Sequence, residues 1–314
     1  MAGFNQSYTN IASQFGMPLF GVSGLPAFTG NVFWVNASLG NDGNTGGPQD
    51  PFATLSAAHS ACVANNNDVV LFTGTISPSA TLAWSKARTH LIGLGPSAKI
   101  AVANVAATTG AFSPLVNVTA AGCIFRGFSV VSGIAQAATQ VAWAEAGGSN
   151  TYEGVTINQV GHATAAAQAG NRALTIASVG NSFTNCVIGG DQVVRATNAN
   201  ATLEFLATGG DNAFTNCVFA MWASAAGDTH VSAASATMSG YTTFTNCSFV
   251  NNLQGAGGTS LTAAFALNGT AGGVALLIGT TASVGATKIS ASGPVYVAGP
   301  VPTAATSNLA VAAA

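Results

Sequence analysis

Two aspartates are the strongest candidates for catalytic residues in the sequence. Asp191 and Asp211 lie 20 positions apart, and each follows a Gly-Gly pair. Two carboxylates placed around a glycosidic bond can cleave it, one as general acid and the other as base or nucleophile. An Asp after Gly-Gly is also a common turn residue, because its side chain bonds to the backbone of the turn. We interpret both as turn residues and keep the catalytic pair as the alternative.

Metal and cofactor chemistry have little support in the sequence. Asp42 and Asp50 lie in a Gly-rich loop that could hold Ca²⁺, but we interpret them as turn formers. None of the four histidines has a metal-ligand spacing: His59, His90, His162 and His230. With nine acidic residues in 314, we expect no enzymatic activity, no cofactor and no metal. A site shared between subunits stays open.

The element that must position these residues is a short phrase that occurs three times. The copies are Phe183-Thr184-Asn185-Cys186, Phe214-Thr215-Asn216-Cys217 and Phe244-Thr245-Asn246-Cys247. The first residues of the copies are separated by 31 and then 30 positions. A fixed step in this range is typical of stacked-repeat proteins.

Within the phrase we expect a strand, a bend at Asn and a second strand. Phe and Cys, three positions apart, would face opposite sides of a straight strand, although both types prefer burial. Asn tolerates the left-handed conformation, so a bend there turns both side chains inward. Successive rungs would then form three ladders: Phe183, Phe214, Phe244; Asn185, Asn216, Asn246; and Cys186, Cys217, Cys247. The prediction is an all-β chain folded as a parallel β-helix.

Weaker copies of the phrase extend the stack toward the N-terminus. Leu91, Phe125 and Tyr152 precede Phe183 at steps of 34, 27 and 31 residues. Arg126 and Glu153 follow two of these positions, so we expect them to pair on adjacent rungs as a structural contact.

Composition excludes several classes of protein. The chain is 48% hydrophobic and 5% charged, with a net charge of −2. Disordered chains are polar and highly charged, nucleic-acid binders carry basic patches, and a membrane helix needs about 18 or more consecutive apolar residues. We therefore expect no nucleic-acid partner and no membrane span. A surface this poor in charge favours contact with other subunits.

The cysteines and the N-terminal sequence suggest a reducing compartment. The five cysteines are an odd number without a disulfide framework, which is typical of a protein made in a cytoplasm. The first residues contain neither a basic region nor an apolar core of a signal peptide. We therefore expect no secretion signal.

The two ends of the chain differ from its middle. Residues 1–31 carry no charge and form either a cap on the helix stack or an arm that binds a partner. The arm hypothesis assigns partner contact to Phe4, Tyr8, Phe15, Met17, Phe20 and Phe28. Residues 32–255 are the expected β-helix. Residues 256–314 are expected to be a C-terminal cap or oligomerisation segment with an apolar tail.

Several segments together resemble a known fold family. These are Trp34-Val35-Asn36, the Gly-rich loop 40–46, Pro51-Phe52-Ala53-Thr54-Leu55 and Asp68-Val69-Val70-Leu71. The series is similar to the opening of pectin-lyase-like right-handed β-helix proteins, and the resemblance covers roughly residues 32–255. It implies a right-handed helix with a short capping helix at its N-terminal end. Apolar residues at helical spacing, Leu55, Ala58 and Cys62, fit that capping helix.

The resemblance leaves function open, because the family includes both enzymes and purely structural virion proteins. The chain also resembles β-helix proteins of phage particles, which are commonly trimers. We expect a capsid decoration or cement protein, assembled in the host cytoplasm as a homotrimer that binds the major capsid protein or another virion protein. The alternatives are a tailspike that binds or cleaves polysaccharide, and an S-layer-like or adhesin subunit.

Overall fold

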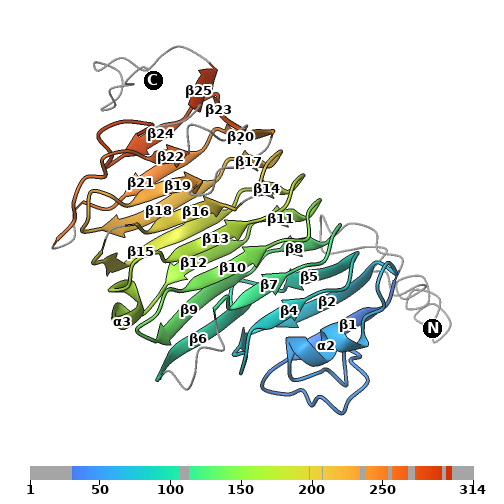
Figure 1. Cartoon of the computed structure of the whole chain (residues 1–314). Helices are drawn as coiled ribbons and strands as arrows, with labels where there is room; N and C mark the ends of the chain where they lie inside the picture. The colour runs from blue at the N-terminus through green and yellow to red at the C-terminus, as the bar shows by residue number, and fades with distance from the viewer. Residues whose placement is uncertain are drawn as a thin grey trace.

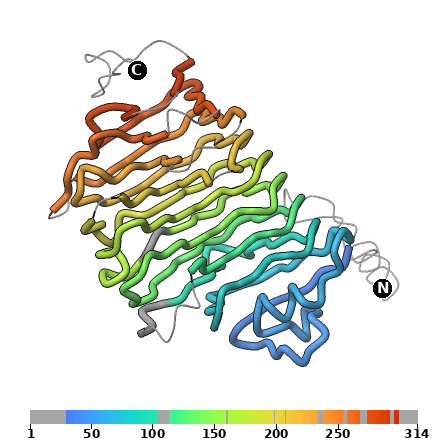
Figure 2. Tube along the Cα trace, in the orientation of Figure 1, coloured from blue at the N-terminus to red at the C-terminus, as the bar shows by residue number. Residues whose placement is uncertain are grey.

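The computed structural model describes residues 30–106, 113–197, 199–206, 208–233, 238, 240–253, 257–267, 273–291 and 295–298. Within them the chain is a right-handed parallel β-helix, as predicted, whose rungs stack along one axis (Figure 1). The tube in Figure 2 shows successive rungs following the same path. The arm or cap expected in 1–31, with its six candidate contact residues, lies outside the described residues except for Gly30 and Asn31.

Most rungs contribute one strand to each of three sheets. The first sheet contains β1 (Val32–Asn36), β2 (Asp68–Thr73), β5 (Thr89–Gly93), β8 (Ile124–Arg126), β11 (Thr151–Glu153), β14 (Ser182–Thr184), β17 (Ala213–Thr215), β20 (Tyr241–Thr245), β23 (Val274–Ile278) and β25 (Val295–Ala298). The second contains β3 (Thr75–Ile76), β6 (Lys99–Ala106), β9 (Ser129–Ala135), β12 (Thr156–Val160), β15 (Val187–Arg195), β18 (Val218–Ala223), β21 (Ser248–Asn251) and β24 (Ala282–Val284). The third contains β4 (Leu82–Trp84), β7 (Val116–Val118), β10 (Val141–Glu145), β13 (Arg172–Ile176), β16 (Ala201–Phe205), β19 (Thr229–Ala233) and β22 (Phe265–Leu267).

The Phe of the repeated phrase fixes the register of the first sheet. Tyr152 pairs with Phe183, Phe183 with Phe214, and Phe214 with Phe244. The rings stack inside the helix with centroids 4.3, 4.6 and 5.0 Å apart. All four side chains are fully buried, so the ladder forms a continuous apolar spine along the axis.

The turn between the first and second sheets requires a left-handed residue. Asn185, Asn216 and Asn246 have φ of 54°, 53° and 53°. Gly127 and Gly154 occupy the same turn in the two preceding rungs, with φ of 70° and 59°. This conformation is costly for residues other than Gly and Asn, which explains why only these two types occur there. The three Asn side chains are exposed, so their ladder lies on the outside of the turn.

The bend turns the cysteine inward. Cys186, Cys217 and Cys247 are buried free thiols, and each Sγ lies 3.4–3.6 Å from a carbonyl oxygen of the preceding rung. The thiols therefore pack as small apolar groups with a weak donor.

Two short helices lie among the described residues, α2 (Leu55–Ala61) and α3 (Ala163–Ala166). The Thr54 hydroxyl caps α2 by accepting a hydrogen bond from Ala57 N at 3.1 Å. Helix α2 packs against β1, β2 and β4 at the N-terminal end of the stack (Figure 1). The capping helix is therefore where the sequence predicts it.

The C-terminal boundary differs from the prediction. The β-helix does not end at residue 255, because β22, β23, β24 and β25 continue the three sheets. In β23, Leu277 pairs with Phe244 and takes the place of the Phe. Gly279, with φ of 72°, takes the place of the Asn. The rung geometry continues after the phrase has changed, so the predicted 256–314 segment contains strands of the β-helix itself.

Candidate functional site

The structure does not bring Asp191 and Asp211 together. Asp191 lies within β15 in the second sheet, whereas Asp211 lies in the turn that leads into β17 of the first sheet. All of β16 in the third sheet separates them along the chain. The spacing of 20 residues thus places Asp191 in a strand of the second sheet and Asp211 in the turn before the first sheet, so they do not form the catalytic pair.

Each of these aspartates has a local structural role. Asp211 adopts φ of 48°, and its Oδ1 accepts a hydrogen bond from Tyr241 N at 2.7 Å in the next rung. Asp191 accepts hydrogen bonds from the side chains of Gln192, at 3.1 Å, and Asn252, at 3.4 Å. Asp211 is the turn residue that the sequence favours, while Asp191 lies in a strand.

Two ion pairs join adjacent rungs. Arg126 and Glu153 approach to 3.1 Å, as expected from their positions, with side chains 24% and 43% exposed. Arg172 and Glu204 are more deeply placed and approach to 2.8 Å. Both pairs link paired strands of adjacent rungs, so they stabilise the stack.

Glu145 is a buried carboxylate that accepts five hydrogen bonds, and no pattern in the sequence pointed to it. Oε1 accepts hydrogen bonds from Gly147 N at 2.7 Å, Gly148 N at 3.0 Å and Ser178 Oγ at 3.2 Å. Oε2 accepts from Asn150 Nδ2 at 3.0 Å and from the Tyr152 hydroxyl. Burial, with the nearby Glu145 charge, raises the pKa of Tyr152 well above its usual value. This network holds a turn in place.

A ladder of buried asparagines lies at the corner between the third and first sheets. Asn150 N donates to Asn181 Oδ1 at 3.0 Å, and Asn181 N donates to Asn212 Oδ1 at 2.9 Å. These residues precede Tyr152, Phe183 and Phe214 by two positions and recur every 31 residues. This 31-residue spacing is visible in the sequence, but the asparagines lie just before the repeated phrase and not within it.

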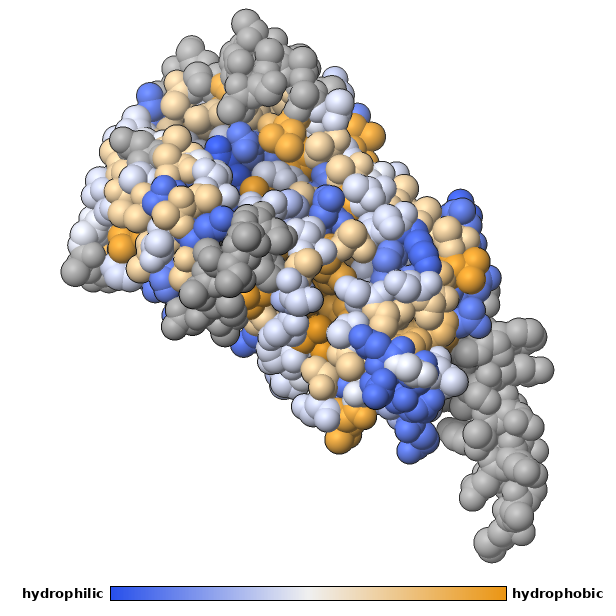
Figure 3. Space-filling view, turned by 60° about the horizontal axis from the view of Figure 1, so that its bottom comes forward, coloured by the Kyte–Doolittle hydropathy of each residue, from blue (hydrophilic) through white to orange (hydrophobic). Residues whose placement is uncertain are grey.

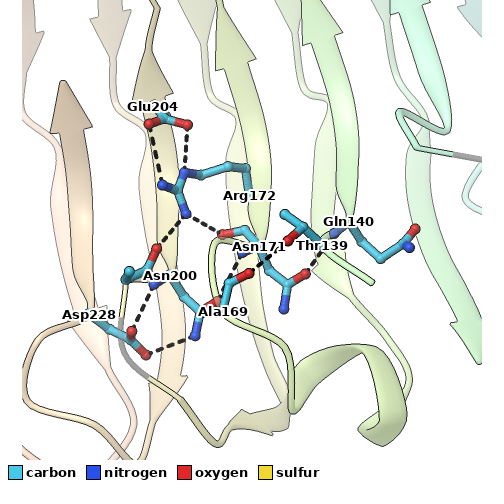
Figure 4. Close-up of polar contacts among 9 residues, drawn as sticks. Thr139, Gln140, Ala169, Asn171, Arg172, Asn200, Glu204 and Asp228 are labelled. Carbon is cyan, nitrogen blue, oxygen red and sulfur yellow. Dashed lines mark hydrogen bonds and ion pairs between the residues drawn. The ribbon is translucent and has the colours of Figure 1, made fainter. Parts of the chain in front are cut away.

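A second polar ladder lies at the corner between the second and third sheets (Figure 4). Gln140 N donates to Asn171 Oδ1, Asn171 N to Asn200 Oδ1, and Asn200 N to Asp228 Oδ1, at 2.7, 2.9 and 2.9 Å. Burial raises the pKa of Asp228 to about 6. The Asp228 carboxylate is the last acceptor of this ladder, whereas side-chain amides are the acceptors at the two preceding positions.

Every carboxylate side chain of the protein has a structural partner. All nine Asp and Glu residues lie in the described part of the chain, and each accepts a hydrogen bond from another residue. They are Asp42, Asp50, Asp68, Glu145, Glu153, Asp191, Glu204, Asp211 and Asp228. Glycan cleavage by paired carboxylates needs two that can face a substrate, and these nine are engaged with the chain itself.

On the described surface, one hollow of about 280 Å³ contains a single ionisable side chain, Asp42, whose carboxylate accepts hydrogen bonds from Ala53 and Thr54. Another hollow of about 380 Å³ is lined largely by glycines, including Gly93, Gly95 and Gly127, and by no ionisable side chain. Within the described ranges, no group of three or more His, Cys, Asp or Glu is arranged to hold a metal. No helix in the described part of the chain has the length and apolar character to cross a membrane.

Three histidines are buried in the neutral form. Burial lowers the pKa of His59 and His90 to about 4 and that of His230 to about 3. His59 Nε2 accepts a hydrogen bond from Ser85 N at 3.0 Å, and His90 Nδ1 accepts one from Ile124 N at 3.1 Å. Protonation of either acceptor nitrogen would remove its bond.

We therefore expect the protein to lose stability in mild acid. Between pH 6.5 and 4, three histidines become protonated in the unfolded chain but stay neutral in the folded protein. The free energy of unfolding therefore decreases as the pH is lowered. Asp228 opposes this, because its raised pKa makes the folded state bind one proton more between pH 6 and 4. The net of about two protons predicts a loss of about 3 kcal/mol per pH unit near pH 5. Thermal melts followed by circular dichroism at several pH values measure it.

The His230→Gln variant tests the assignment. It removes one of the three titrating histidines and so lowers the net from about two protons to about one, which should roughly halve the slope. A melting temperature that stays constant from pH 7 to 4.5 would show that these imidazoles are not held neutral.

Comparisons with known proteins extend the result on the fold. No protein-family model matches the sequence, and no curated protein matches it. Among solved structures, a rhamnogalacturonan lyase has a TM-score of 0.59 at 15% identity, covering 82% of this chain and 70% of that one. Pectate lyase Pel9A has a TM-score of 0.56 at 14% identity, covering 85% and 77%. ORF18 of Geobacillus virus E2 is also found, at a TM-score of 0.37, 11% identity and coverage of 73% and 53%.

The fold class follows from the rungs and from these comparisons. The chain is a right-handed parallel β-helix with the fold of pectin-lyase-like proteins. At 14–15% identity the two lyases share a fold with this chain, and fold alone does not determine activity.

Proposed function

We propose that this chain is a non-enzymatic structural protein of a phage particle, a decoration or cement protein on the outer surface of the head. The observation that carries the non-enzymatic part is the engagement of all nine carboxylates in structural hydrogen bonds. The partner is the major capsid protein or another virion protein. The virion setting rests on the sequence resemblance and on the composition.

The character of the surface supports a role in assembly. Only 16 of 314 residues are charged, seven basic and nine acidic. On the face shown in Figure 3, hydrophilic residues form small separate groups among weakly polar and apolar ones. Several large apolar side chains are exposed, including Leu39 at 79%, Tyr241 at 67% and Tyr296 at 59%. Such a surface suits contact with other subunits.

We propose a homotrimer as the assembled form, because closed cyclic symmetry is the default for such subunits and the phage β-helix proteins that the sequence resembles are commonly trimers. Sedimentation equilibrium measures the state directly. A monomer over the whole accessible concentration range would refute the trimer.

An assay on polysaccharide separates the structural role from that of a cleaving tailspike. The purified protein should leave host capsule, lipopolysaccharide and polygalacturonate intact, with or without Ca²⁺. Degradation that Asp191→Asn or Asp211→Asn abolishes would favour the tailspike. An ordered lattice on cells would instead favour the S-layer-like alternative.

We predict that residues 2–29 anchor the protein to the particle. The described stack has α2 packed at its N-terminal end, so the fold from Gly30 onward contains a cap of its own. Deletion of residues 2–29 should leave the melting temperature nearly unchanged and abolish co-sedimentation with particles. A matched full-length variant, Phe4→Ser with Phe15→Ser and Phe20→Ser, should lose binding in the same way. A deletion variant that aggregates or melts far below the intact protein would favour the cap.

A further inference from the structure

The second sheet is irregular where β12 and β15 lie side by side. Gly190 pairs with Met221 and Arg195 pairs with Ala223, so four residues of β15 oppose a single residue of β18. The pairing of β12 with β9 also shifts register. Bulges of this kind occur frequently beside binding sites, because they redirect side chains and open the ladder.

A small pocket of about 50 Å³ lies at these irregularities. Its lining includes Val131 of β9, Asn158 of β12, Gly161, and Gly190, Gln192 and Arg195 of β15. Gly161 and Gln192 are exposed and place the pocket at the surface, whereas Arg195 is 1% exposed. Among the described residues that line the pocket, only Arg195 carries a charge.

Two guanidinium nitrogens of Arg195 have no hydrogen-bond partner among the described residues. These atoms, Nε and Nη1, are buried. The two ion pairs of the described residues involve other arginines. Burial lowers the pKa of Arg195 to about 9, and the attraction of Asp228 offsets this only in part. A buried cation without a partner is strongly unfavourable, so the site favours an incoming negative charge.

Arg172 shows how this protein satisfies a buried arginine. Its Nε donates to Glu204 at 2.8 Å, and its Nη1 donates to the carbonyls of Asn171 at 3.0 Å and Ala199 at 2.7 Å (Figure 4). Arg195, one rung further along, has no equivalent set of acceptors. The contrast singles out Arg195 as the buried arginine whose Nε and Nη1 have no acceptor among the described residues and could take one from a bound anion.

We propose that this pocket binds a small monoanion, a halide or a single carboxylate group, against Arg195. A volume of about 50 Å³ exceeds the minimum of about 10–15 Å³ that one water needs, so the pocket has room for an anion of a few atoms. The side-chain amides of Asn158 and Gln192 lie in the pocket wall. Gln192 Nε2 already donates one hydrogen to Asp191 Oδ1 at 3.1 Å, which leaves its second amide hydrogen for the anion. A bound anion would link β9, β12 and β15 and hold the bulge in one conformation.

Thermal melts of the full-length protein test the proposal, with chloride and formate as separate probes at constant ionic strength. Either anion should raise the melting temperature of the wild-type protein by about 5 °C near saturation. Arg195→Met should melt higher than wild type without the anion and show no shift with it. Arg88→Met, which removes an exposed arginine, should keep the full shift.

A second variant keeps Arg195 and closes the pocket. A Cβ at Gly161 would lie 3.4 Å from Val131 Cγ1, an ordinary contact, so Gly161→Val should fill the space without a backbone clash. Chloride-35 NMR line broadening should appear with wild type and Arg88→Met and vanish with Arg195→Met and Gly161→Val. A wild-type protein without shift or broadening, or an Arg195→Met variant that retains either, would overturn the proposal. A melting-temperature shift with chloride but not with formate would identify a halide site. A shift with formate but not with chloride would identify a carboxylate site.

Discussion

The Cys217→Asp variant is expected to yield no folded protein at room temperature. Cys217 is 1% exposed, and its Sγ lies 3.4 Å from the carbonyl oxygens of both Phe183 and Thr215. A carboxylate there would face two acceptors and no donor, so it would be buried without a partner. The expected loss exceeds about 5 kcal/mol, which is comparable with the whole stability of many domains. Circular dichroism and gel filtration measure the outcome.

Cys217→Ser is the matched control. Its hydroxyl can donate to the same carbonyl oxygens, so it should cost only about 1 kcal/mol. If Cys217→Asp melted within a few degrees of Cys217→Ser, the interior position of the cysteine ladder would be wrong.

The Glu145→Ala variant should lose about 5 kcal/mol or more. Five donors on the chain point at this carboxylate, including Gly147 N, Asn150 Nδ2 and the Tyr152 hydroxyl. Removing their acceptor leaves buried donors unsatisfied, at about 1–3 kcal/mol each. Urea unfolding followed by fluorescence of the buried Trp143, which donates to the Tyr152 hydroxyl at 3.2 Å, reports this change.

Glu153→Ala provides the comparison on the neighbouring strand. It removes the same chemical group, but Glu153 is 43% exposed and pairs with Arg126 alone. A surface ion pair contributes about 0–1 kcal/mol. Equal losses in the two variants would contradict the structural role assigned to Glu145.

The repeated phrase made the interior of the first sheet predictable. Phe, Asn and Cys each have one strong preference, for burial or for the left-handed conformation, and the 30-residue step aligns them. The capping helix was predictable for a similar reason, since Thr54 precedes apolar residues at helical spacing. At these positions the conformational and burial preferences of the residues match what the rung requires, so the sequence alone predicts the structure.

The polar corners were harder to predict, because their residues change type from rung to rung. Gln140, Asn171, Asn200 and Asp228 form one ladder at steps of 31, 29 and 28 residues, so neither identity nor spacing is constant. The final rungs were missed because Leu277 and Gly279 replace the Phe and Asn of the phrase. Asp191 and Asp211 were left open as a pair because linear spacing does not reveal on which sheet or turn of a rung a residue lies.

The most direct test of the proposed role is the composition of purified particles. Quantitative mass spectrometry of intact phage, and of heads separated from tails, gives the ratio of this chain to the major capsid protein. A decoration protein should be present on isolated heads at a fixed ratio set by the capsid lattice. Absence from the heads, or presence only in the tail fraction, would contradict the account.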